Sequence, residues 1–185
     1  MEKKVIVLLA EGFEEVEAVT PIDYLRRAGL SVTVAALGES TLVTGAHGIP
    51  ITADSTLKVL VSGVANWDAI VIPGGIPGAD NIAANKDALA LIQKMATAGK
   101  TVAAICASPA RVLAPLGILA GHGFTCYPGM ESEVAVAAFR ADSVVVDSNL
   151  ITGRSAGTAG LFSLAIIGAL VGKEAAAKLA KSVLL

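Results

Sequence analysis

The sequence is poor in charged side chains, which make up only 16% of its 185 residues. Globular domains commonly carry about 25%. Hydrophobic residues account for 54%, and the formal net charge is −2. This balance excludes an intrinsically disordered chain, which combines low hydrophobicity with high net charge. It also argues against a nucleic-acid partner, because such a domain needs a basic face.

Long apolar runs are also missing, although a membrane span needs about 20 predominantly apolar residues. Prolines interrupt the uncharged stretch at residues 112–130, and the stretch at 155–172 has an apolar centre covering only residues 160–171. The apolar run near the N-terminus ends at Glu11, and no signal-peptide cleavage site follows it. We therefore expect one cytoplasmic domain, residues 1–185, with no membrane contact and with an apolar helix buried in the core or in a subunit interface.

Cysteine and histidine are scarce, at two residues each. Cys106 and Cys126 are too few for a disulfide framework. Together with His47 and His122 they show no spacing typical of a metal site, so we expect no metal. Neither histidine is next to Cys106 in sequence, and we expect both to be solvated loop residues. For Cys126 we expect ordinary burial.

Strand and helix patterns alternate along the chain. Apolar runs predict strands at residues 5–9, 31–36, 69–72 and 101–105, and hairpins at 41–52 and 143–152. Helical patterns cover residues 14–28, 86–98, 109–116, 158–171 and 174–182. This alternation predicts an α/β fold with a mostly parallel sheet and helices on both faces. In such sheets ligands bind beyond the carboxyl ends of the strands. We therefore expect the functional residues to follow the strands directly.

The segment TVAAICASPAR, residues 101–111, places a cysteine where a strand runs directly into a helix. Small residues flank Cys106, as the tight turn of a nucleophile elbow requires. Pro109 suits the first helical turn, because N–H groups there have no helical partner. The amides and dipole of a helix N-terminus favour a thiolate. We predict a nucleophile elbow at Cys106; the alternative is a structural cysteine that packs as a small hydrophobe.

Two glycines follow the strand at 69–72, in the segment PGGIPG at residues 73–78. Gly74 and Gly75 allow the backbone to approach a ligand closely. The N–H groups of Gly75 and Ala107 would then form an oxyanion hole beside Cys106. The segment matches neither the dinucleotide-binding fingerprint nor a P-loop, and we expect no cofactor. An ordinary Pro-Gly-Gly turn is the alternative.

Acidic residues follow the first strand, in the segment EGFEEVEA at residues 11–18. Glu14 and Glu15 complement the dipole of the helix that begins there. Glu17 falls on a stripe that we expect to face inward. The stripe consists of Phe13, Val16, Thr20 and Tyr24. Burial raises the pKa of a carboxyl group, which suits proton transfer beside a thiolate. The alternative is a buried ion pair with Arg26, Arg27 or Arg111.

Together these segments resemble the ThiJ/PfpI superfamily, within it the branch of the Parkinson-disease-associated protein deglycase and bacterial YajL. The resemblance rests on EEVE at residues 14–17, PGG at 73–75 and AAICA at 103–107, in this order, and extends over residues 4–183. It implies a flavodoxin-like three-layer sandwich and a homodimer. It also implies that a protonated Glu17 hydrogen-bonds a reactive Cys106, in a pocket lined by the backbone of Gly74, Gly75 and Ala107.

Three positions depart from the family pattern. The peptidase-like branch has a histidine directly after the nucleophile, where this chain has Ala107, so we do not expect a protease. Tyr127 occupies the place of a histidine in the human-type member; it can bind a substrate oxygen but is a poor general base. Residues 154–158 lack the Gly-Pro-Gly of the branch, which leaves the shape of that loop unpredicted.

The resemblance implies a cofactor-independent enzyme of the glyoxalase III or protein deglycase type, a lyase or hydrolase that needs no glutathione. Its substrates would be 2-oxoaldehydes such as methylglyoxal, or their early adducts on proteins. Cys106 would form a hemithioacetal, and Glu17 would shuttle the proton that leads to a 2-hydroxy acid. The alternative is an oxidative-stress sensor or chaperone in which Cys106 is oxidised to sulfinic acid and Cys126 is a candidate resolving thiol. A cysteine hydrolase or peptidase with a distant histidine is a third, less favoured reading.

Overall fold

The computed structural model describes residues 2–61, 67–135 and 137–185. Its main sheet has the strand order β10-β11-β7-β6-β1-β2-β5. The strands are β1 (Lys4–Leu9), β2 (Ser31–Ala36), β5 (Ser55–Thr56), β6 (Ala69–Ile72), β7 (Thr101–Ile105), β10 (Val144–Asp147) and β11 (Leu150–Gly153). Neighbouring strands are parallel except for β10 and β11, which form an antiparallel hairpin. The predicted α/β fold with a mostly parallel sheet is confirmed.

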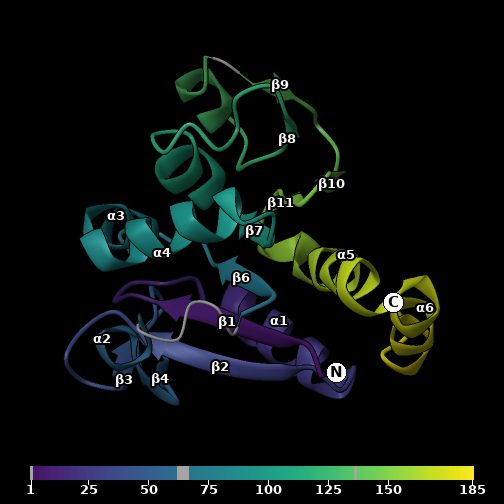
Figure 1. Cartoon of the computed structure of the whole chain (residues 1–185), viewed down its shortest axis with the longest axis horizontal. Helices are drawn as coiled ribbons and strands as arrows, with labels where there is room; N and C mark the ends of the chain where they lie inside the picture. Colours follow the sequence, from purple (N-terminus) through teal and green to yellow (C-terminus); the bar gives the residue numbers. More distant parts are fainter. Residues whose placement is uncertain (1, 62–66, 136) are drawn as a thin grey trace.

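Helices cover both faces of this sheet, and Figure 1 shows α4 and α5 on opposite sides of it. The helices are α1 (Glu15–Arg27), α2 (Leu57–Leu60), α3 (Gly78–Ala84), α4 (Lys86–Thr97), α5 (Ala159–Val171) and α6 (Lys173–Ser182). Two small sheets lie outside the main one. They pair β3 (Leu42–Thr44) with β4 (Pro50–Thr52), and β8 (Gly123–Phe124) with β9 (Ala138–Phe139). The β3–β4 pair is the hairpin predicted at residues 41–52.

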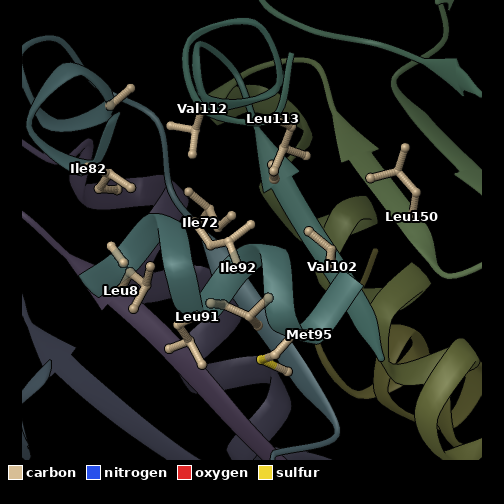
Figure 2. Close-up of a cluster of buried hydrophobic side chains, with 14 of the residues drawn as sticks. Leu8, Ile72, Ile82, Leu91, Ile92, Met95, Val102, Val112, Leu113 and Leu150 are labelled. Atoms are coloured by element: carbon tan, nitrogen blue, oxygen red, sulfur yellow. The ribbon is translucent and has the colours of Figure 1, made fainter. Parts of the chain in front are cut away.

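Two layers of apolar side chains hold the three layers of the sandwich together, because successive residues of a strand point to opposite faces. On one face, side chains of β6, β7 and β11 pack against α4 (Figure 2). This layer includes Ile72, Val102, Leu150, Leu91, Ile92 and Met95. On the other face, Val7 and Leu9 of β1 pack in a cluster with Phe162 and Ile166 of α5. Each fully buried side chain of this size contributes about 1.5–3 kcal/mol, so the strands are fixed firmly.

The helix predicted at residues 109–116 is shorter and wound more widely than expected. It is a π-helical turn, η2 (Pro109–Leu113), closed by a hydrogen bond of 3.0 Å from the N–H of Ala114 to the carbonyl of Pro109. The chain turns away at Gly117, whose φ of 72° lies in the left-handed region. Isolated π turns are frequent at functional sites, and this one directly follows Cys106.

The inward stripe predicted for α1 is wrong in one part. Val16 is 49% exposed, whereas the buried face of the helix contains Glu17, Ala18, Pro21 and Leu25. This face repeats every three to four residues, but it lies about one residue further round the helix than the predicted stripe. Glu17 is buried as predicted, because it belongs to the face that contacts the sheet.

A bilayer-spanning helix is not found within the described ranges, since none of their helices is long and apolar enough.

Candidate active site

Four adjacent strands, β11, β7, β6 and β1, end at the same edge of the sheet, because they are parallel neighbours. The segments that follow them therefore converge. β7 leads into Cys106, β6 into Pro73 and the two glycines, and β1 into the loop before α1. The structure thus brings together Cys106, Gly74, Gly75 and Glu17, which are far apart in the sequence. The predicted location beyond the strand ends is where these residues lie.

Cys106 has the backbone conformation of a nucleophile elbow. Its φ of 63° lies in the left-handed region, which costs a residue with a side chain roughly 1–2 kcal/mol. Two hydrogen bonds hold it there: its N–H donates to the carbonyl of Gly153 at 2.9 Å, and its carbonyl accepts from the N–H of Tyr127 at 2.8 Å. Backbone strain of this kind persists where surrounding contacts enforce it, and functional sites are where it concentrates.

The sulfur of Cys106 lies among backbone amides and a carboxyl group. Burial raises the pKa of the Cys106 thiol, and the charge and hydrogen bond of Glu17 raise it further. Hydrogen bonds from the N–H groups of Ala107 and Gly75 oppose this rise, because they favour the thiolate. These are the two amides that the sequence predicted beside the nucleophile. They can stabilise a negative charge on sulfur or on an oxygen bound next to it.

Glu17 is fully buried, and its carboxyl group lies close to the side chain of Cys106. Its Oε2 accepts a hydrogen bond of 2.9 Å from the N–H of Gly74. Burial raises the pKa of Glu17 to about 7, while its hydrogen bond to Cys106 acts in the opposite direction. Its Oε1 is buried and has no hydrogen-bond partner among the described residues. Near neutral pH this group can therefore both release and accept a proton.

The alternative of a buried ion pair for Glu17 does not hold, because the three arginines contact other acids. Arg26 pairs with Asp54 at 3.0 Å, Arg27 with Asp23 at 2.6 Å, and Arg111 with Glu133 at 3.5 Å. All three pairs are partly exposed. The side chain that lies beside the carboxyl group of Glu17 is instead that of Cys106.

Position 74 has no room for a side chain, because Glu17 and Cys106 both pack against Gly74. A Cβ built on Gly74 would lie 2.5 Å from Oε2 of Glu17 and 2.7 Å from Cβ of Cys106. Distances this short require one of the two groups to move. The glycine thus sets how closely the acid and the thiol approach each other, and an ordinary turn does not explain it.

Several residues of the site carried no signal in the sequence. Ser108 is fully buried and donates from Oγ to the carbonyl of Pro73 at 2.5 Å, which ties η2 to the loop after β6. The backbone N–H of Ala156, in the loop before α5, lowers the pKa of Glu17. That loop, whose shape was not predicted, is closed by a capping box between Ser155 and Thr158. Only tertiary contacts reveal these roles.

The remaining candidates lie further out. Tyr127 is 50% exposed, and its backbone N–H supports the carbonyl of Cys106. Cys126 is fully buried, as expected. His122 lies 3.5 Å from Asp147, and no contact between either histidine and Cys106 is found in the ranges that the structure describes.

One side-chain group could hold a metal ion. Ligand atoms of Glu14, Glu15 and His47 lie within 4.8 Å of one another. Glu15, however, already accepts hydrogen bonds from the N–H of His47 at 2.7 Å and from its Nδ1 at 2.8 Å. The group is thus explained as an anchor that fastens the β3–β4 turn to the start of α1.

The sequence is similar to those of known proteins. A family model described as the DJ-1/PfpI family matches residues 3–169. Protein dj-1beta of Drosophila melanogaster is 38% identical over 186 residues, which cover 100% of this chain and 98% of that protein. Deglycase PH1704 of Pyrococcus horikoshii is 35% identical over 153 residues, which cover 82% of this chain and 89% of the relative. Protein DJ-1 homolog B of Arabidopsis thaliana is 39% identical over 181 residues.

The Arabidopsis relatives are longer proteins. The chain spans less than half of their length, 41% of homolog B and 46% of homolog A. Among solved structures, Drosophila melanogaster DJ-1beta aligns with a TM-score of 0.95 at 37% identity, covering 100% of this chain and 99% of that one. Oxidised Toxoplasma gondii DJ-1 aligns with a TM-score of 0.95 at 35% identity, covering 98% of each chain.

Proposed function

This chain belongs to the DJ-1/PfpI family, and on that premise we propose that it converts 2-oxoaldehydes to 2-hydroxy acids without a cofactor. The substrate would be methylglyoxal or its early adducts on proteins. One observation carries the proposal: the fully buried carboxyl group of Glu17 lies close to the cysteine of the elbow, and burial raises its pKa to about 7. A relative of 35% identity that bears the name deglycase supports the reaction class.

The first step uses the Cys106 thiolate while Glu17 carries the proton of the pair. The sulfur adds to the aldehyde carbon, and the former carbonyl oxygen takes up the electron pair. The amides of Gly75 and Ala107, which already point at the sulfur, stabilise the developing oxyanion. Glu17 then gives its proton to this oxygen. The product is a hemithioacetal, with Glu17 left as a carboxylate.

The next steps move one hydrogen and need no external oxidant. The Glu17 carboxylate removes the proton from the former aldehyde carbon, and the electrons pass to the neighbouring ketone, which gives an enediolate. Glu17 returns the proton to that second carbon, while the hydroxyl proton of the first carbon passes to the oxygen of the second. The first carbon is now oxidised to a thioester and the second is reduced to an alcohol. Water hydrolyses the thioester, which releases the 2-hydroxy acid and restores Cys106.

The site geometry supports this chemistry over a peptidase reaction. A cysteine peptidase needs an imidazole to activate the thiol and to protonate a leaving amine. Here the group next to Cys106 is the Glu17 carboxyl, and Ala107 follows the nucleophile. An aldehyde has no leaving group, so one carboxyl that shuttles a proton is sufficient. Tyr127, which is half exposed, can donate a hydrogen bond to a substrate oxygen from the solvent side.

Lactate formation from methylglyoxal in the absence of glutathione tests the proposal. We expect one lactate enantiomer from the wild type, and no turnover from Cys106→Ala or Glu17→Gln. Cys126→Ala is the matched control, since it removes the other thiol and should keep the activity. An inactive wild type, or a Cys106→Ala variant of unchanged activity, would refute the enzyme. Peroxide titration that then adds two oxygens to Cys106 at stoichiometric peroxide would favour the oxidative-stress sensor.

A further inference from the structure

Three hydrogen bonds form a closed ring between the start of α1 and the loop after β6. The N–H of Glu14 donates to the carbonyl of Gly74 at 3.0 Å. The N–H of Gly74 donates to Oε2 of Glu17 at 2.9 Å. The N–H of Glu17 donates to Oε2 of Glu14 at 2.7 Å, which makes Glu14 the N-cap of α1. The ring fixes Glu17 beside Cys106 through both its backbone and its side chain.

Glu14 is an unusual cap for this place. Serine, threonine, asparagine and aspartate are the side chains that helices prefer as N-caps. A neutral cap would complete the same hydrogen bond without bringing a second negative charge close to Glu17. The carboxylate of Glu14 is only 15% exposed, so water screens it poorly. Its charge raises the pKa of Glu17, and the 2.7 Å hydrogen bond from the N–H of Glu17 holds that charge beside Glu17.

We propose that Glu14 is a positioning residue whose charge keeps the shared proton on Glu17, so that Cys106 is left as the thiolate. One proton can be placed on the Cys106–Glu17 pair in two ways. With the proton on sulfur, a charged Glu17 faces a charged Glu14. With the proton on Glu17, this repulsion disappears and the negative charge moves to the sulfur, where two amides receive it.

The charged groups around the ring are few within the described residues. Glu17 faces Cys106 from the end of β7 and Glu14 from its own helix. Glu14 faces His47, whose Nδ1 lies 4.0 Å from its Oε1, at the turn between β3 and β4. Glu15 directs its carboxylate to His47 at 2.8 Å. Protonation of His47 would therefore weaken the effect of Glu14 at acidic pH. For this reason the wild type and its variants are compared at several pH values.

The test measures the rate at which iodoacetamide alkylates Cys106 between pH 5 and pH 9. Trypsin cleaves after Arg111, so Cys106 and Cys126 fall on separate peptides and mass spectrometry follows each alone. Glu14→Gln keeps the capping oxygen but removes the charge. We expect its alkylation rate near pH 7 to fall roughly three- to tenfold, with the rise in rate moved to higher pH. Glu14→Asp, which keeps the charge, should retain the wild-type profile.

Glu11→Gln is the matched control. Glu11 undergoes the same change of charge in the same loop, but its Oε2 accepts from the N–H of Thr44 and does not contact Glu17. Its profile should equal that of the wild type. If Glu14→Gln does not fold, as judged by circular dichroism, the pair Glu14→Asp and Glu14→Asn gives the same comparison, because both are good caps.

A Glu14→Gln profile that coincides with the wild type would overturn the inference, and so would an equal shift in Glu11→Gln. The inference rests on the proposed proton exchange between Glu17 and Cys106. Its readout, however, needs no aldehyde turnover. A protein that alkylates as expected but produces no lactate would lose the proposed function and keep the role of Glu14.

Discussion

At the scale of single residues, burial of Glu17 makes stability depend on pH. Its pKa is raised from 4.5 to about 7, so the folded state holds the proton more tightly than the unfolded state. The contribution to stability is then fully present below pH 4.5 and is lost as the pH rises towards 7. A shift of this size corresponds to a loss on the order of 3 kcal/mol.

Chemical denaturation of the wild type and Glu17→Gln at pH 5 and pH 8 checks this prediction. The free energy of unfolding of the wild type should fall relative to that of the variant as the pH rises, since glutamine does not titrate. The difference between the two proteins removes the contributions of His47 and of other titrating groups. An equal pH dependence in both proteins would show that Glu17 titrates normally.

The sequence was informative about residues whose type is unusual for their place. A lone cysteine between a strand and a helix predicted the elbow at Cys106, and a glutamate on an apolar face predicted the burial of Glu17. The assignment of Val16 to that face was wrong, because a helix rotates by about 100° per residue and one step separates buried from exposed. The contacts of Glu14 and Ser108 could not be predicted, since they depend on loops that meet only after folding.

At the scale of elements, the close approach of two loops at Gly74 determines the site. We expect Gly74→Ala to lower the rate of Cys106 alkylation at least tenfold. The added methyl group would push the Glu17 carboxyl and the Cys106 side chain apart. The overpacking should also cost about 1–3 kcal/mol of stability. Alkylation kinetics and denaturation curves provide the two measurements.

Gly38→Ala is the control for this variant. The atom nearest to a Cβ at Gly38 would be 4.0 Å away, so the substitution meets open space on an exposed loop. A Gly74→Ala variant that alkylates as fast as Gly38→Ala would show that the approach of the two side chains does not depend on the glycine.

Element prediction succeeded for the buried strands and failed for short helical segments without a recognisable period. The strands at 69–72 and 101–105 have the predicted bounds, because buried parallel strands consist of continuous apolar runs. The seven-residue helix α3 was not predicted, since it is too short to show a helical period and follows two prolines and two glycines. The π-helical form of η2 also left no mark in the sequence.

At the scale of the whole molecule, one face is more apolar than a surface needs to be. Val16 and Val19 of α1 and Leu161 of α5 are 46–49% exposed, and α1 packs against α5. α5 contains no charged residue. Exposed apolar side chains gathered on neighbouring helices are typical of association sites. We propose that a second copy of this chain covers the face and forms a homodimer, as the family resemblance implies.

Sedimentation velocity of Val19→Glu and Leu161→Glu tests the dimer. Each variant places a charge that would be buried in the interface, and we expect a monomer at concentrations where the wild type is a dimer. Val59→Glu is the control, because Val59 is 69% exposed on α2 rather than on the apolar face. A monomeric wild type, or variants that remain dimeric, would contradict the assignment of this face.

The most direct test of the Cys106–Glu17 chemistry is the fate of the migrating hydrogen. Methylglyoxal is converted in heavy water, and proton NMR shows which isotope the alcohol carbon of lactate carries. A hydrogen that travels as a proton on Glu17 can exchange with solvent, so we predict deuterium at that carbon in at least part of the product, with no lactate from Cys106→Ala. Lactate that contains only protium there would mean that the hydrogen is transferred without exchange with solvent, as in a hydride shift, and it would contradict the solvent-exchanging proton shuttle assigned to Glu17.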